Sequence, residues 1–210
     1  MSLEKANAGP VMHLLVILYG SRKREEVSLD RYGEEQRRVE IDLRPRLPRR
    51  GMTPLEISQW AHHFVGVNYQ SFKHSQKWHC EYCDKPARMS ESQLMSWTHL
   101  DPPRMNIYMH FVCNPSVGPC AEILRQAIVE AARLSGQPPP PRRIERENPL
   151  DWPTMGACAG CEKDETATHK TKVCAGCQLT RYCSAACQKN HWREHKAVCK
   201  MEKTVKWVWD

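Results

Sequence analysis

No apolar run in this 210-residue sequence is long enough to cross a bilayer, which takes about 20 such residues. The longest run, Val11–Tyr19, spans nine residues and includes His13, so we interpret it as a buried strand. It is also a poor signal peptide, because Arg22-Lys23-Arg24 follows where a small-residue cleavage site would stand. We therefore expect no membrane association and an intracellular protein, in the nucleus or the cytoplasm.

Common catalytic signatures are also missing. The sequence has no Gly-rich phosphate loop, no Gly-x-Ser-x-Gly turn and no His-Glu-x-x-His motif. Isolated Cys or His residues do not form a catalytic site without a positioned partner. The sequence therefore predicts a protein that is not an enzyme.

Cysteine is abundant, with 11 residues among 210. An odd count is unusual for a fully disulfide-bonded secreted chain, and most of these residues stand in Cys-x2-Cys pairs near histidines. This pattern indicates thiolates bound to metal in a reducing compartment rather than a disulfide scaffold.

The formal charge of +7 would suggest nucleic-acid binding, but this figure treats every cysteine as neutral. Ionising all 11 thiols on three Zn²⁺ ions would lower the net charge to about +2. The best remaining basic patch, Arg44–Arg50, follows the acidic residues Glu40 and Asp42, so we interpret it as a solvated loop. Nucleic acid is therefore an unlikely partner.

Six prolines between Gly136 and Pro153 mark an extended spacer between two clusters of metal ligands. We therefore predict an α+β protein with a small mixed N-terminal domain over residues 1–135, a proline-rich linker over 136–153, a zinc module over 154–200 and a C-terminal tail over 201–210.

The N-terminal part combines strand and helix patterns, while the stretch Ser21–Arg38 has no clear periodicity. Thr53-Pro54-Leu55-Glu56 carries the signals of a helix start. Strands are predicted at Val11–Tyr19, Val39–Leu43 and Asn106–Val112, and helices at Pro54–Val65 and Cys120–Leu134.

The C-terminal module has eight zinc-type ligands within 42 residues, enough for two tetrahedral sites. Every ligand position is supplied by protein, so these are predicted to be structural zinc ions. The segment has too few apolar residues for a core of its own, and metal binding should supply most of its folding free energy. The ligands are Cys158, Cys161, Cys174, Cys177, Cys183, Cys187, His195 and Cys199.

In its spacing and in the interior residues Tyr182-Cys183-Ser184, Gln188 and Trp192, the segment Cys158–Cys199 resembles a MYND zinc finger. With the Cys-rich segment before it, the chain resembles uncharacterised fungal MYND-finger proteins. The resemblance covers 42 of 210 residues. It implies a cross-brace, in which one zinc is bound by Cys158, Cys161, Cys183 and Cys187, and the other by Cys174, Cys177, His195 and Cys199.

The same resemblance implies a partner. Many MYND fingers bind proline-containing peptides of PxLxP type at positions that correspond here to Gln188 and Trp192. An exposed indole suits a stiff proline segment, although Trp192 could instead be core packing for a small module. Ala175 stands where peptide-binding relatives can have Ser, so one hydroxyl contact would be missing.

A third zinc site is predicted in the N-terminal part, from Cys80, Cys83, Cys113 and Cys120. These four are the thiols that remain after the seven of the C-terminal module, and Cys120 begins a helix, where a thiolate is favoured. His110 is the alternative fourth ligand, since His110-x2-Cys113 is itself a common zinc half-site. The absence of a third metal is the other alternative.

Together these patterns predict a non-catalytic, zinc-binding adaptor for protein–protein interaction, in transcriptional regulation by analogy with MYND relatives. A methyltransferase is the first alternative, because some relatives carry the finger inserted in a SET domain, but no SET-type Asn-His cofactor motif is visible here. A zinc-dependent nucleic-acid binder is the other.

Overall fold

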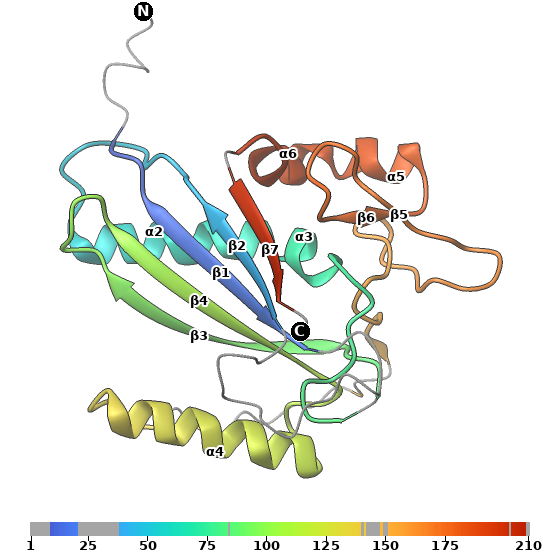
Figure 1. The fold of residues 1–210 in the computed structure, drawn as a ribbon, viewed down its shortest axis with the longest axis horizontal. Coiled ribbons are helices and arrows are strands. Elements are labelled where there is room, and N and C mark those ends of the chain that lie inside the picture. The colour runs from blue at the N-terminus through green and yellow to red at the C-terminus, as the bar shows by residue number, and fades with distance from the viewer. Residues whose placement is uncertain are drawn as a thin grey trace, which may run out of the picture.

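The computed structural model describes residues 9–20, 38–83, 85–139, 141, 148, 151–201 and 203–208. Its main element is a five-stranded sheet with the order β3-β4-β1-β2-β7. A finger, used here for residues 154–200, lies at one end of this sheet (Figure 1). The strands of the sheet are β1 (His13–Tyr19), β2 (Arg38–Leu43), β3 (Met89–Trp97), β4 (Arg104–Val112) and β7 (Lys203–Val208).

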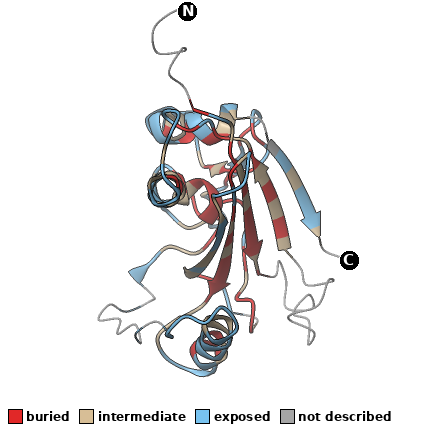
Figure 2. Cartoon of the chain, turned by 90° about the vertical axis from the view of Figure 1, so that its left-hand side faces the viewer, coloured by how far each residue is buried: buried red, intermediate tan, exposed pale blue. Residues whose placement is uncertain are grey.

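The sheet is mixed, because β1 and β4 run parallel while every other pair is antiparallel. Strand β2 alternates buried Val39, Ile41 and Leu43 with partly exposed neighbours, so one face of this strand packs on the core. The central strands are the most buried part of the molecule (Figure 2).

Helix α2 (Pro54–Val67) covers one face of the sheet (Figure 1). Its start follows from the sequence: the Thr53 side chain accepts from the Glu56 N–H, and the Glu56 carboxylate accepts from the Thr53 N–H at 2.7 Å. Ile57 and Ala61, four residues apart, face the core.

The predicted strands and helices agree with the structure to within a few residues, including α4 (Pro119–Leu134). Of the stretch Ser21–Arg38, only Arg38 is among the described residues. Outside the finger, three of the described elements were not predicted: β3, α3 (Tyr69–Lys73) and β7. Strand β7 lies in the segment expected to be a tail, and its six residues pair with all six of β2.

Helix α4 lies below the sheet and is largely exposed along its length (Figures 1 and 2). Its first turns supply Cys120, Ala121 and Leu124 to a small core of their own, shared with Cys80 and Val112. This second core is separate from the main one.

The finger contains a two-stranded sheet of β5 (Lys172–Val173) and β6 (Arg181–Tyr182), followed by α5 (Ala185–Asn190) and α6 (Trp192–Lys200). Its buried residues join the main core, among them Met155, Leu179 and Val198. The chain then leaves α6 and enters β7 of the N-terminal sheet. The division into domains stays a prediction. In the structure, the finger and the N-terminal part share the main core.

The arginine patch is largely engaged within the protein. Arg44 pairs with Asp42, Arg49 pairs with Glu56, and Arg46 donates to the Gly9 carbonyl at 3.0 Å. Among the described residues, no helix has the length and apolar character that crossing a membrane demands.

Candidate metal centres

The first centre brings four thiols together from three places in the fold. Cys80 and Cys83 lie in the loop between α3 and β3, Cys113 follows β4, and Cys120 lies in the first turn of α4. Their sulfurs all lie within 4.8 Å of one another, and Cys83 Sγ is 3.8 Å from Cys113 Sγ. A hydrogen bond from the Cys80 thiol is the main reason that the pKa of Cys113 falls to about 5.

His110, the alternative fourth ligand, is not part of this group. Its Nδ1 lies 2.8 Å from a carboxylate oxygen of Glu81, and its ring stacks on Tyr19. Cys120 therefore takes the fourth position in the structure.

The finger holds two further groups, and they are interleaved as the resemblance implies. Cys158, Cys161, Cys183 and Cys187 form one, with Cys161 Sγ 3.8 Å from Cys183 Sγ. Ser184 caps α5 by accepting from the Cys187 N–H at 3.1 Å, which directs the helix start toward this group.

The second group of the finger consists of Cys174, Cys177, His195 and Cys199. Cys174 Sγ lies 3.9 Å from Cys199 Sγ, and Cys177 Sγ lies 3.6 Å from His195 Nε2. Both helix ligands are on α6, four residues apart and therefore on one face.

These three groups fit zinc in both chemistry and spacing. A tetrahedral ion with Zn–S bonds of about 2.3 Å holds its sulfurs about 3.8 Å apart, and a Zn–N bond of about 2.0 Å places nitrogen about 3.5 Å from sulfur. The four separations given above lie within 0.1 Å of these values, the Cys183–Cys187 sulfurs are closer at 3.4 Å, and all 11 cysteines are free of disulfides. The protein thus has three Cys/His clusters suited to structural zinc, two in the finger and one in the N-terminal part.

A surface hollow of about 290 Å³ lies beside the finger's helices, lined by Ala185, Gln188, Lys189 and Trp192. Trp192 is partly exposed, and the edge of its ring system meets the His195 ring at 6.0 Å between centroids. Gln188 donates from Nε2 to Cys174 Sγ at 3.2 Å. The two residues predicted to bind peptide therefore share one hollow directly beside a zinc centre.

A larger hollow, of about 610 Å³, follows the apolar side of α4. Pro139 and Pro141 line it together with Leu124 and Ile128. These two prolines of the spacer therefore lie against α4, away from the hollow beside Trp192.

Sequence reasoning missed the buried polar residues between the finger and the N-terminal part. Ser71 and Thr180 contact the His195 ring, and Tyr182 OH lies 2.9 Å from His191 Nδ1. Burial, reinforced by Lys73 and His191, lowers the pKa of His74 to about 3, so this fully buried ring stays neutral. No local spacing signals these contacts, because Ser71 meets His195 across 124 positions, Thr180 meets His195 across 15, and Tyr182 meets His191 across 9.

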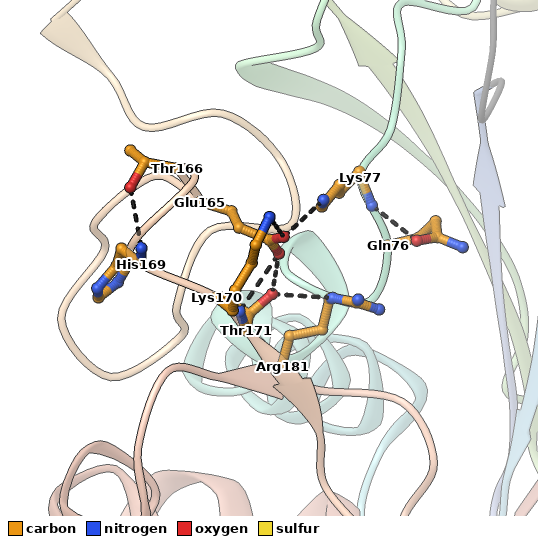
Figure 3. Close-up of polar contacts among 8 residues, drawn as sticks. All are labelled: Gln76, Lys77, Glu165, Thr166, His169, Lys170, Thr171 and Arg181. Carbon is orange, nitrogen blue, oxygen red and sulfur yellow. Dashed lines mark hydrogen bonds and ion pairs between the residues drawn. The ribbon is translucent and has the colours of Figure 1, made fainter.

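A second contact fixes the loop before β5 on the N-terminal part (Figure 3). Glu165 receives Lys77 Nζ at 2.8 Å and the Thr171 hydroxyl at 2.7 Å, while Arg181 donates to that hydroxyl at 3.2 Å. Burial raises the pKa of Glu165, but these hydrogen bonds outweigh it and lower the pKa to about 2.

Comparison with known proteins agrees with this geometry. The family model of the MYND finger matches residues 158–199, the span that holds both interleaved groups. This segment is a MYND finger. No solved structure matches the chain significantly.

The curated relatives share this region alone. The chain is 35% identical to human histone-lysine N-methyltransferase SMYD3 over 69 residues, which are 32% of this chain and 16% of that protein. It is 42% identical to Arabidopsis thaliana histone-lysine N-methyltransferase ASHR1 over 52 residues, or 25% and 10% of the two chains. It is also 42% identical to the Schizosaccharomyces pombe SET domain and MYND-type zinc finger protein 6 over 43 residues, or 20% and 8%. The chain thus spans less than a fifth of each relative.

Proposed function

We propose that this protein is a non-catalytic adaptor that acts in transcriptional regulation, and that its MYND finger binds proline-containing segments of other proteins. The hollow lined by Gln188 and Trp192 is the observation that carries this proposal. The three cysteine-rich groups support a reducing intracellular compartment as its place of action, because cysteine ligands must stay reduced to bind zinc.

The residues that line the hollow have the chemistry that a proline segment needs. Proline-rich peptides are stiff and lose little entropy on binding, and they pack against aromatic faces. Gln188 already uses one N–H on Cys174, which orients its amide. A second N–H and the carbonyl oxygen of the same amide can bond a peptide backbone.

The surroundings of the hollow favour an acidic partner. Lys189 lines it, Lys200 Nζ lies 6.0 Å from the centre of the Trp192 ring, and Lys196 is exposed one turn along α6. Glu194 is the one acidic residue of α5 and α6, and it approaches His191 at 3.5 Å. A proline segment flanked by Asp or Glu would therefore bind better than a neutral one.

Methyltransferase activity is named for two of the relatives, but what this chain shares with them is the MYND region. No SET-type Asn-His cofactor motif is visible in the sequence. We therefore favour an interaction role, because it requires only the MYND finger that the chain contains.

Titration calorimetry with peptides of PxLxP type, with and without flanking acidic residues, tests the proposal. Trp192→Ala should weaken binding about 30-fold or more, because loss of an aromatic anchor costs about 2 kcal/mol or more. Trp152→Ala is the matched control, since Trp152 is an exposed indole outside the hollow. The zinc content of both variants should equal that of the wild type.

The proposal fails if Trp192→Ala binds the peptides as tightly as the wild type, or if it loses zinc and so behaves as core. If random duplex DNA binds at physiological salt and displaces the peptide from the finger, the site belongs to nucleic acid instead.

A further inference from the structure

One ligand of the finger's second zinc centre, His195, contacts a residue that lies outside the MYND finger. His195 is fully buried, and its two ring nitrogens face in opposite directions. Nε2 lies 3.6 Å from Cys177 Sγ within the ligand group, while Nδ1 lies 3.0 Å from Ser71 Oγ. Ser71 belongs to α3, and 124 positions separate it from His195.

The ring nitrogen that binds zinc must offer a lone pair, so the proton of a neutral imidazole has to sit on the other nitrogen. Here that places the proton on Nδ1, where it needs an acceptor within a region that excludes water. Ser71 and Thr180 are the hydroxyls within reach, at 3.0 and 3.4 Å, and both are buried. Ser71 is the closer acceptor.

Thr180 supports this arrangement from the finger side. Its hydroxyl donates to the main-chain carbonyl of Ser71 at 3.4 Å, so the threonine proton points toward α3 and its oxygen can accept. The finger therefore donates two hydrogen bonds to Ser71, one from Thr180 to its main-chain carbonyl and one from His195 Nδ1 to its hydroxyl.

The N-terminal part holds the Ser71 hydroxyl in position. The Ser71 N–H bonds to the Asn68 carbonyl at 3.0 Å, and the next residue, Phe72, is fully buried in the main core. At the end of this helix the His74 carbonyl accepts from the Arg181 N–H of β6 at 3.1 Å. The acceptor for His195 is thus fixed by residues that lie outside the MYND finger.

We propose that Ser71 is a positioning residue for the finger's second zinc centre, and that the N-terminal part thereby raises the zinc affinity of the finger. The residue orients His195 and selects the tautomer with the proton on Nδ1. Outer hydrogen-bond partners of this kind typically change metal affinity by about 10- to 100-fold. Because binding and folding are linked, zinc at this centre also stabilises the docking of α3.

The test compares three variants of the full, zinc-loaded chain in competition with a chromophoric chelator. Ser71→Ala should lower the affinity of one of the three zinc equivalents by about 10- to 100-fold and leave the other two unchanged. Ser71→Thr, which keeps a hydroxyl, should restore the affinity. Ser75→Ala is the control, since Ser75 is a buried serine of the same segment that accepts from Trp78 Nε1 at 3.1 Å and should leave all three equivalents unchanged.

Two spectroscopic readouts identify the centre. In the cobalt-substituted protein the loss should fall on the absorption of the Cys₃His site, and long-range proton–nitrogen correlation should show His195 protonated on Nδ1 in the wild type. The proposal is overturned if Ser71→Ala retains wild-type affinity, or if Ser75→Ala loses the same equivalent to the same degree. A His195 protonated on Nε2 in the zinc-loaded wild type overturns it as well, even if Ser71→Thr does not fold.

Discussion

Gly156 provides a sharp test of whether the finger packs on the N-terminal part in solution. It has a positive φ of 86°, and a Cβ added there would lie 2.7 Å from the Gln76 carbonyl oxygen and 2.8 Å from Lys77 Cα. Both are main-chain atoms, so neither can move aside cheaply. Gly156→Ala therefore combines a strained backbone with a steric overlap against a segment about 80 positions away in sequence.

The two contributions can be separated. A left-handed conformation costs an ordinary residue about 1–2 kcal/mol, and overpacking adds about 1–3 kcal/mol. Gly51→Ala is the matched control, because Gly51 also has a positive φ, of 67°, but nothing lies within 4 Å of its added Cβ. We expect a loss of about 2–5 kcal/mol for Gly156→Ala and about 1–2 kcal/mol for Gly51→Ala.

The assay is urea unfolding of the zinc-loaded protein, followed by tryptophan fluorescence, with the zinc content measured before each titration. If Gly156→Ala lowers the free energy of unfolding no more than Gly51→Ala does, residues 76–77 do not contact the finger, and the docked arrangement is wrong.

Metal removal, pH and salt give three further tests. Elemental analysis of native, reduced protein should give three zinc ions per chain, and Cys80→Ser should retain two, because the core around Cys80 is separate from that of the finger; a variant without any zinc would contradict this. Glu165→Gln should cost about 1–2 kcal/mol, since a charged acceptor is lost from a partly exposed pair. The pKa of Glu165 is lowered to about 2 in the folded protein, so its carboxylate stabilises the fold fully above the unfolded pKa of about 4.5 and loses this effect as pH falls toward 2. The stability difference between Glu165→Gln and the wild type should therefore be constant between about pH 6 and 8. A difference that changes over that interval would assign the effect to another group. Binding of an acidic proline peptide should weaken as salt rises, and Lys200→Glu should weaken it further while the neutral peptide is little affected; equal losses for both peptides would remove the charge argument.

The ligand residues followed from the sequence because zinc half-sites are encoded locally, whereas the interleaving of the finger's two sets followed from the family resemblance. A Cys-x2-Cys turn aims two sulfurs at one ion, and His195 and Cys199 lie one helical turn apart whatever surrounds them. Strands β1, β2 and β4 and helices α2 and α4 were predictable for a similar reason, since their patterns and caps act over a few residues. The choice of Cys120 over His110 needed the fold, because the spacing allows both and the Glu81 partner of His110 is 29 residues away.

What the tertiary structure alone decided is how the finger is attached. Residues 203–208 were expected to be part of a tail, and they form strand β7 because β2 offers an edge beside the end of α6. Ser71 is an ordinary helix serine until the fold brings it to His195. The sequence by itself indicated the Cys and His pairs suited to zinc, because each pair is local, whereas the docking of the finger on the N-terminal part depends on contacts across about 70 to 170 positions that no local pattern encodes.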